Sequence, residues 1–144
     1  MKEKNIKLYQ KLITKNAHIS IVGLGYVGLP LLLALGKEGF QVTGIDIDNK
    51  KISNLKQNKS YISDITNDEL SNNIKSIKNI NFTNKYESIK NSDVIIICVP
   101  TPLNKTKDPD ISYIINATEQ LAKYSLNNKL ISVESTVWPG ATEE

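Results

Sequence analysis

The feature that most constrains the fold is a glycine-rich turn that directly follows a short β-branched apolar run. Residues 18–22 read His-Ile-Ser-Ile-Val, and the turn Gly23-x-Gly25-x-x-Gly28 comes next. Gly23 permits a tight exit from a strand, Gly25 lets the backbone approach a pyrophosphate, and Gly28 lets the next helix lie close to the sheet. That helix would direct free N–H groups and its positive dipole end at the phosphates. The turn therefore predicts a strand–turn–helix unit that binds a dinucleotide.

A glycine turn alone could be an ordinary entry into a helix, but its neighbours support the dinucleotide hypothesis. Residues 31–38 have the composition of a helix, and a second strand, 41–46, ends in Asp46. Asp46 lies 18 residues after Gly28, close to the ~20 expected for the carboxylate that binds the adenosine ribose. A 2′-phosphate would meet a like charge there, so Asp46 favours NAD over NADP. Asp48 is the expected N-cap of the next helix.

Composition argues against several classes of function. All 18 basic residues among the 144 are lysines, spread along the chain, and the net charge is only +3. Nucleic-acid binding normally uses arginine forks and clustered basic faces, so no nucleic-acid partner is expected. The sequence has no apolar run of the length of a signal peptide core or membrane span, which predicts a cytoplasmic protein without a membrane partner. Cys98 is the single cysteine, in an apolar run, and is expected to be a buried structural thiol, with no metal site.

Strand and helix patterns alternate along the chain, which predicts an α/β fold. The expected architecture is a Rossmann-type doubly wound parallel sheet in a single domain, because runs such as residues 94–99 are apolar without alternation. Apolar residues at helical spacing in the first 14 residues predict an N-terminal amphipathic helix, so we expect a helical extension (1–16) followed by an NAD-binding domain (17–144). The expected strands are 18–23, 41–46, 80–83, 93–99 and 129–134, and the expected helices are 26–38, 48–58, 67–77, 85–90 and 112–126.

Two further segments are expected at the edge of the sheet where a ligand binds, beyond the carboxyl ends of the strands. Val99-Pro100-Thr101-Pro102 follows the fourth strand, and its prolines stiffen a loop that would pass beside the cofactor. Ser135-Thr136 follows the fifth strand. Each segment taken alone could be an ordinary loop that connects a strand to a helix. The only histidine, His18, begins the first strand at the opposite end and is interpreted as structural.

Together these motifs resemble the UDP-sugar 6-dehydrogenase family, within the UDP-glucose/GDP-mannose dehydrogenase superfamily, over nearly the whole chain. The matching segments are Gly23–Pro30, Gly44–Asp48, Cys98–Leu103, Asp108–Ser112 and Glu134–Glu144. The resemblance implies NAD contacts by the glycine turn, Asp46, Thr101 and Thr136, and Lys51 stands where the family commonly has an arginine. The candidate cofactor-binding residues are Gly23, Leu24, Gly25, Tyr26, Val27, Gly28, Asp46, Lys51, Val99, Pro100, Thr101, Pro102, Ser135 and Thr136.

The resemblance also implies an activity. Family enzymes oxidise the C6 alcohol of a UDP-sugar to a carboxylate with two NAD, through a thioester on a cysteine. Thr136 is the candidate catalytic residue, because the matching threonine helps to position the hydrolytic water. The family cysteine and the sugar-binding half correspond to sequence after residue 144, so we expect a truncated NAD-binding domain without turnover of its own.

Two segments, 61–65 and 138–144, resemble the branch that acts on UDP-N-acetylhexosamines for surface or capsular polysaccharide precursors. The implied partners are NAD, a UDP-sugar and, for the full-length protein, further copies of itself in a homo-oligomer. Two alternatives remain open: a stand-alone NAD-sensing regulatory Rossmann domain, and the cofactor domain of another two-domain dehydrogenase. Residues 99–102 and 134–140 argue against both, because neither alternative requires those motifs.

Overall fold

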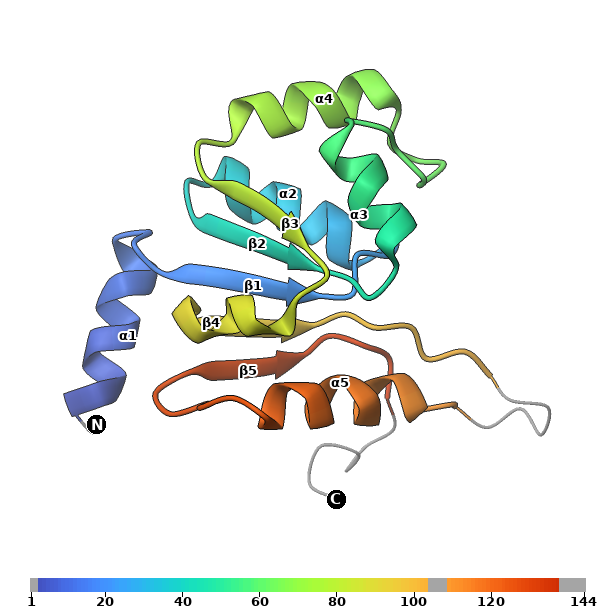
Figure 1. Ribbon diagram of the computed structural model, residues 1–144. Coiled ribbons are helices and arrows are strands. Elements are labelled where there is room, and N and C mark those ends of the chain that lie inside the picture. The colour runs from blue at the N-terminus through green and yellow to red at the C-terminus, as the bar shows by residue number, and fades with distance from the viewer. Residues whose placement is uncertain (1–2, 104–108, 138–144) are drawn as a thin grey trace.

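The computed structural model describes residues 3–103 and 109–137, and its centre is a parallel sheet of five strands (Figure 1). The strand order is β3-β2-β1-β4-β5, and every neighbouring pair is parallel. The chain builds the sheet outward from β1 in one direction, then returns and builds it in the other. The predicted doubly wound sheet is confirmed. The strands are β1 (His18–Val22), β2 (Gln41–Ile45), β3 (Ile80–Thr83), β4 (Val94–Ile97) and β5 (Leu130–Val133).

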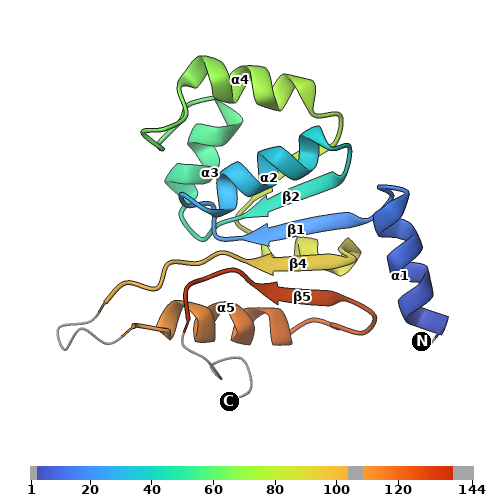
Figure 2. The same ribbon diagram turned by 180° about the vertical axis from the view of Figure 1, so that it is seen from behind.

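Helices cover both faces of the sheet, as the view from behind also shows (Figure 2). On one face, α2, α3 and α4 pack their apolar residues against β1 and β2. On the other face, η1 and α5 contribute Ile89, Ala117 and Leu121 to a second cluster with β4. The helices are α1 (Glu3–Ile13), α2 (Gly28–Lys37), α3 (Asn49–Lys56), α4 (Asn67–Ser76), the 3₁₀ helix η1 (Tyr86–Asn91) and α5 (Ser112–Ala122).

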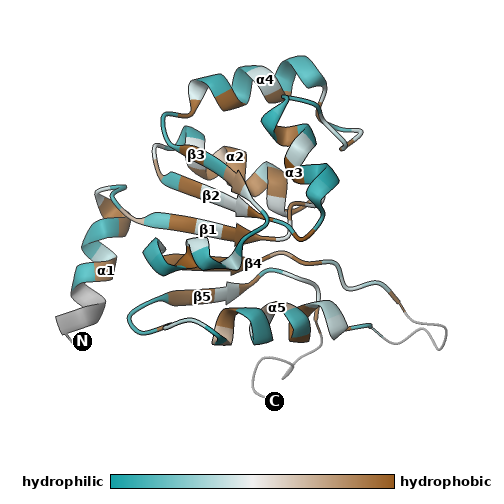
Figure 3. Cartoon of the chain, viewed as in Figure 1, coloured by the Kyte–Doolittle hydropathy of each residue, from teal (hydrophilic) through white to brown (hydrophobic). Residues whose placement is uncertain are grey.

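The central strands β1 and β4 are rich in apolar residues, as the hydropathy colouring shows (Figure 3), and most of these side chains are buried. Ile21, Ile95 and Ile97 have no exposed surface. Full burial of such a side chain stabilises the fold by roughly 1.5–3 kcal/mol. The prediction of a two-sided parallel sheet from the apolar runs is therefore confirmed, except at the edge strand β5, where Leu130 is 46% exposed.

Several predicted elements differ from the observed ones in extent or type: the helix expected at 48–58 is Asn49–Lys56, and the strand expected at 93–99 is Val94–Ile97. The helix expected at 26–38 begins at Gly28, because Tyr26 and Val27 belong to the turn. The helix expected at 85–90 is a 3₁₀ helix, since this short crossover closes i to i+3 hydrogen bonds, such as Ser92 N–H to Ile89 C=O. The helix expected at 112–126 ends at Ala122.

Local capping explains where α3 and α4 begin. The Asp48 carboxylate accepts a hydrogen bond from Lys50 N–H at 2.8 Å, which confirms Asp48 as an N-cap. Thr66 caps α4 and forms a reciprocal capping box with Glu69. Such a cap stabilises a helix by about 1 kcal/mol. The Thr66 cap therefore fixes the end of the segment that connects α3 to α4.

The N-terminal helix α1 lies beside the amino ends of the strands (Figure 1). Leu8 and Leu12 pack against the first core, whereas Tyr9 and Ile13 stay exposed. The predicted amphipathic helix is confirmed, although only part of its apolar surface is covered. No helix in residues 3–103 or 109–137 is long and apolar enough to cross a membrane. The motif residues Asp108 and Trp138–Glu144 lie outside the described residues.

Candidate functional site

The glycine turn joins β1 to α2 and requires glycine at its first position. Gly23 has a φ of +94°, and a Cβ there would lie 2.7 Å from the carbonyl oxygen of Cys98. Its N–H donates to Ile45 C=O at 2.8 Å, which extends the pairing of β1 with β2. A side chain at Gly23 would therefore strain the backbone and collide with the chain just after β4.

The other two motif glycines have different roles. A Cβ at Gly28 would lie 1.8 Å from the carbonyl oxygen of Gly23, so Gly28 is required for α2 to pack under the turn. A Cβ at Gly25 would meet nothing within 4 Å. The protein itself does not need glycine at this position, so the space beside Gly25 is free for a ligand to approach the backbone.

Backbone donors at the start of α2 are left without acceptors. Within residues 3–103 and 109–137, the N–H groups of Gly25, Tyr26, Val27 and Gly28 donate to no protein group. The N-cap residue Val27 supplies no side-chain acceptor, and the first turn of α2 contains no acidic residue. An uncapped helix N-terminus combines free donors with the positive end of the helix dipole, which is the chemistry that binds phosphate.

Asp46 stands at the end of β2, directly beside this turn. Its Oδ2 accepts hydrogen bonds from Leu24 N–H at 2.8 Å and from Lys51 Nζ at 3.0 Å, and its Oδ1 accepts from Asp48 N–H at 2.9 Å. Asp46 is only 6% exposed, so this paired charge is held in a fixed orientation. A carboxylate oxygen has two lone pairs, so Oδ1 retains one for a ribose hydroxyl.

Two adjoining cavities of about 630 and 500 Å³ lie along the carboxyl ends of the strands. These volumes fall in the range of small-molecule sites. Residues that line both cavities are Gly23, Asp46, Lys51, Val99 and Pro100. The glycine turn and Asp46 thus divide one extended crevice into two halves, at the position where an open parallel sheet binds its ligand.

Residues 17–144 match the model of the UDP-glucose/GDP-mannose dehydrogenase family, NAD binding domain. The chain belongs to the UDP-glucose/GDP-mannose dehydrogenase family. Because the match is to its NAD-binding domain, the cofactor of this fold is NAD. The free donor row, the open approach at Gly25 and the carboxylate of Asp46 all fit this dinucleotide.

Relatives in the family have closely similar sequences and structures. Protein CapL of Staphylococcus aureus is 40% identical over 129 residues, which cover 90% of this chain and 29% of CapL. The UDP-N-acetyl-D-glucosamine 6-dehydrogenase of Salmonella typhi is 40% identical over 126 residues, covering 88% of this chain and 28% of that protein. The structure of the UDP-N-acetyl-mannosamine dehydrogenase Cap5O from S. aureus superimposes with a TM-score of 0.78 at 30% identity, covering 89% of this chain and 30% of that one. The chain therefore spans about 30% of the length of these relatives.

Most of the predicted site residues of this family domain meet at the crevice. Eleven of the fourteen line one or both cavities: Gly23, Gly25, Tyr26, Val27, Asp46, Lys51, Val99, Pro100, Thr101, Ser135 and Thr136. The other three are placed differently. Leu24 has a fully buried side chain, Gly28 is buried beneath the turn, and Pro102 is exposed outside both linings.

The loops after β4 and β5 are tied together at the second cavity. Ser135 Oγ donates to Val99 C=O at 2.6 Å. Thr136 is exposed at the same rim, and Thr101 also lines this cavity. The structure therefore brings the two loops that sequence analysis assigned to the ligand edge to one wall of the crevice.

Cys98 is a buried thiol, as predicted. Burial raises its pKa to about 11, and the negative charge of Glu134 adds to the effect. The thiolate is the nucleophilic form, so a thiol with this pKa is unreactive near neutral pH. Cys98 is part of the first hydrophobic core, beneath the glycine turn.

Sequence reasoning missed several cavity residues. Tyr113, Asn116 and Gln120 line the first cavity from α5, and Tyr86 lines it from η1. Their three-to-four-residue spacing on α5 is a polar stripe that helical periodicity could have identified. Tyr61 lines the second cavity from the loop between α3 and α4, and only the structure reveals how far this loop reaches.

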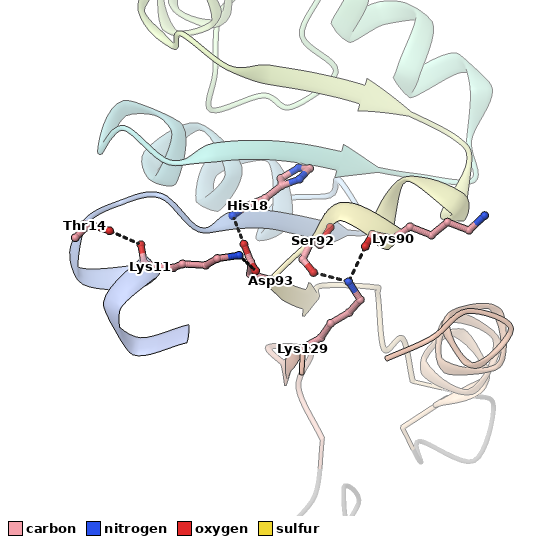
Figure 4. Close-up of polar contacts among 7 residues, drawn as sticks. All are labelled: Lys11, Thr14, His18, Lys90, Ser92, Asp93 and Lys129. Atoms are coloured by element: carbon pink, nitrogen blue, oxygen red, sulfur yellow. Dashed lines mark hydrogen bonds and ion pairs between the residues drawn. The ribbon is translucent and has the colours of Figure 1, made fainter. Parts of the chain in front are cut away.

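The opposite edge of the sheet has a polar cluster of its own, shown in Figure 4. Asp93 pairs with Lys11 of α1 and accepts from His18 N–H at 3.0 Å. The Lys129 ammonium donates to the carbonyl groups of Lys90 and Ser92. His18 Nε2 lies 2.9 Å from Thr43 Oγ1. Its place at the start of β1, remote from the crevice, agrees with the structural role predicted for it.

Proposed function

We propose that this chain binds NAD along the glycine turn and serves as the cofactor domain of a nucleotide-sugar 6-dehydrogenase. The observation that carries the proposal is the row of four N–H groups, residues 25–28, which have no acceptor in the part of the chain that the structure describes. Three of these residues, Gly25, Tyr26 and Val27, line a cavity beside Asp46. A row of unpaired donors at a helix N-terminus binds phosphate well, because it supplies hydrogen bonds and positive potential together.

Each element of the crevice has an assigned role in this proposal. The N–H groups of residues 25–28 hold the pyrophosphate, and Asp46 Oδ1 accepts from the adenosine ribose. The first cavity takes the adenosine half, while the loops with Thr101 and Thr136 flank the nicotinamide half in the second cavity. When bound, NAD supplies a hydride acceptor, and the protein's task is to fix its orientation.

Cofactor choice follows from the pair formed by Asp46 and Lys51. A 2′-phosphate would lie against the Asp46 carboxylate, and the cation that could neutralise it, Lys51, already pairs with Asp46 at 3.0 Å. Lysine also lacks the planar guanidinium group with which arginine forms bidentate hydrogen bonds to phosphate. We therefore expect NAD to bind more tightly than NADP.

The substrate of the full-length protein is proposed to be a UDP-N-acetylhexosamine. The names of the Salmonella typhi and Cap5O relatives support this, and the name of CapL supports a role in making capsular polysaccharide precursors. Thr136, exposed at the crevice rim, is the proposed group that positions the hydrolytic water. We also propose a cytoplasmic setting, as expected from the sequence pattern, and a homo-oligomeric full-length protein, as the family resemblance implies.

Calorimetric titration of the 144-residue chain with NAD, NADP and a panel of UDP-sugars tests the proposal. We expect NAD to bind and NADP to bind at least about tenfold more weakly, a difference of ~1.4 kcal/mol. Equal or tighter binding of NADP would refute the role of Asp46. We also expect no NADH to form when NAD and any UDP-hexose are mixed with this chain, because hydride transfer requires a sugar held at a fixed angle to the cofactor.

A measurement of turnover separates this proposal from an NAD-sensing regulatory domain. A sensor would bind NAD but would have no use for Thr136. In a complete enzyme carrying this domain, Thr136→Ala should lower turnover, because Thr136 is exposed in the lining of the second cavity, where the nicotinamide half is proposed to bind. Unchanged turnover would remove Thr136 from the mechanism.

A further inference from the structure

Leu24, the second residue of the glycine turn, is held on three sides. Its N–H donates to Asp46 Oδ2 at 2.8 Å, and its C=O accepts from the Tyr61 hydroxyl at 2.6 Å. Its side chain is fully buried against β2, where a Cβ on Gly44 would come within 2.9 Å of the Leu24 methyl groups. The residue immediately before the free donor row is therefore fixed by the protein alone.

Tyr61 reaches Leu24 from the loop between α3 and α4, and that loop is itself anchored. The next residue, Ile62, is only 4% exposed and belongs to the first core. Ser60 N–H donates to Asn67 Oδ1, at the start of α4, at 2.7 Å. The Tyr61 hydroxyl thereby contacts a turn that lies 37 residues earlier in the chain.

Asp46 and Tyr61 are linked through Lys51. The Lys51 ammonium lies 3.0 Å from Asp46 Oδ2 and 5.8 Å from the centre of the Tyr61 ring. Burial, with the charges of Asp46 and Asp48, raises the pKa of Tyr61 well above its usual value. The hydroxyl therefore remains protonated at neutral pH and can donate to Leu24 C=O throughout.

We infer that Tyr61 is a positioning residue for the diphosphate of the cofactor. Its hydroxyl holds the carbonyl group of Leu24, so that the next three residues, which line the second cavity, keep their positions before any ligand binds. The inference rests on the proposed function. In this proposal the N–H groups of the donor row contact only the phosphates of the ligand. Loss of the Tyr61 hydroxyl should therefore weaken diphosphate binding and leave nucleoside binding unaltered, whereas a general structural defect would weaken both.

The test is Tyr61→Phe, which keeps the ring over Lys51 and removes only the hydroxyl. NAD, ADP and adenosine are each titrated into the wild-type and variant chains and followed by amide NMR, with thermal unfolding to verify that both are folded. One lost hydrogen bond corresponds to about a fivefold effect. We expect NAD and ADP to bind about fivefold more weakly, and adenosine to bind with unchanged affinity.

Tyr124→Phe is the matched control, because Tyr124 is also half-buried but lines neither cavity. It should leave all three affinities unchanged. An equal loss for adenosine and ADP in Tyr61→Phe, or no loss for either, would overturn the positioning role. Failure of the wild-type chain to bind NAD would instead refute the proposed function on which the inference rests.

Discussion

The polar groups at the two ends of the parallel strands, called here the amino edge and the carboxyl edge of the sheet, differ in whether they have partners within the protein. At the amino edge, Lys11 pairs with Asp93, which also accepts from His18 N–H, and Lys129 donates to two carbonyl groups (Figure 4). At the carboxyl edge, the N–H groups of residues 25–28 have no acceptor within the described residues. The same parallel strands thus end in a closed polar network on one side and an open row of donors on the other.

This difference shows which polar groups serve the fold and which are available to a ligand. A buried or half-buried polar group that the protein satisfies contributes to stability, and its removal costs the desolvation of its partner. N–H groups that have no acceptor within the protein contribute little to the stability of the fold. We therefore expect variants at the amino edge to alter stability and variants at the carboxyl edge to alter NAD affinity.

The largest effect is expected for Gly25→Val. The position has a negative φ and nothing within 4 Å of its Cβ direction, so the fold should survive, while the branched side chain blocks the approach of the pyrophosphate. NAD affinity should fall about 100-fold or more, which corresponds to ~2.7 kcal/mol. Calorimetry measures this, with circular dichroism to check folding.

Gly28→Ala is the informative comparison for that variant. Its Cβ would lie 1.8 Å from Gly23 C=O, so this smaller change should destabilise the fold itself. A folded Gly25→Val protein with normal NAD affinity would show that the glycine turn is only an entry into α2.

Asp46→Ala should have the next largest effect. It removes the ribose acceptor and also releases Leu24 N–H and Lys51. A charge-assisted hydrogen bond contributes roughly 1.5–3 kcal/mol, so NAD affinity should fall about 10- to 100-fold. NADP should lose less, because the released Lys51 can meet its 2′-phosphate, and the preference for NAD should shrink.

Asp48→Ala provides the control for Asp46. It removes a neighbouring carboxylate that caps α3 through Lys50 N–H but does not contact Leu24. We expect a stability loss of about 1 kcal/mol and little change in NAD binding. If both alanine variants weakened NAD equally, the specific position of Asp46 would not matter.

The smallest effect on NAD is expected at the amino edge, from Asp93→Asn. Burial acts to raise the pKa of Asp93, but hydrogen bonds from Lys11 and His18 N–H, with the charges of Lys11 and Lys129, lower it overall from 3.8. A carboxyl group whose pKa is lower in the folded state stabilises the protein above its unfolded pKa and loses that contribution as the pH falls through the folded value.

Urea unfolding of wild type and Asp93→Asn at about pH 7 and about pH 3 tests this sign. The variant should be less stable than wild type near neutrality, and the difference should shrink in acid, while NAD affinity near neutrality stays within about twofold. A large loss of NAD affinity in Asp93→Asn would contradict the expectation that variants at the amino edge alter only stability.

Much of the fold could be predicted from local patterns. The glycine turn, the acid at the end of β2 and the two-sided apolar runs of β1 and β4 each report a local requirement of a doubly wound sheet. Helix ends were less accurate. The predicted start of α2 is two residues too early, because Tyr26 and Val27 are compatible with a helix but belong to the turn.

Residues that line the crevice could be identified from the sequence where they belong to a local motif, as Gly25 and Asp46 do. It was not predictable where two distant segments meet. Tyr61 follows α3 by several residues, and nothing in its neighbourhood indicates that its hydroxyl reaches Leu24. Leu24 is itself predicted to bind the cofactor, but its N–H and C=O groups already form hydrogen bonds with Asp46 and Tyr61.

The central claim is that the open N–H row at residues 25–28 binds NAD, and amide NMR during an NAD titration tests it most directly. The account predicts that the amides of Gly25, Tyr26, Val27 and Gly28 show the largest shifts at saturation, while those of His18, Asp93 and Lys129 at the amino edge remain unchanged. Saturable NAD binding that leaves the amides of residues 25–28 unshifted would contradict it.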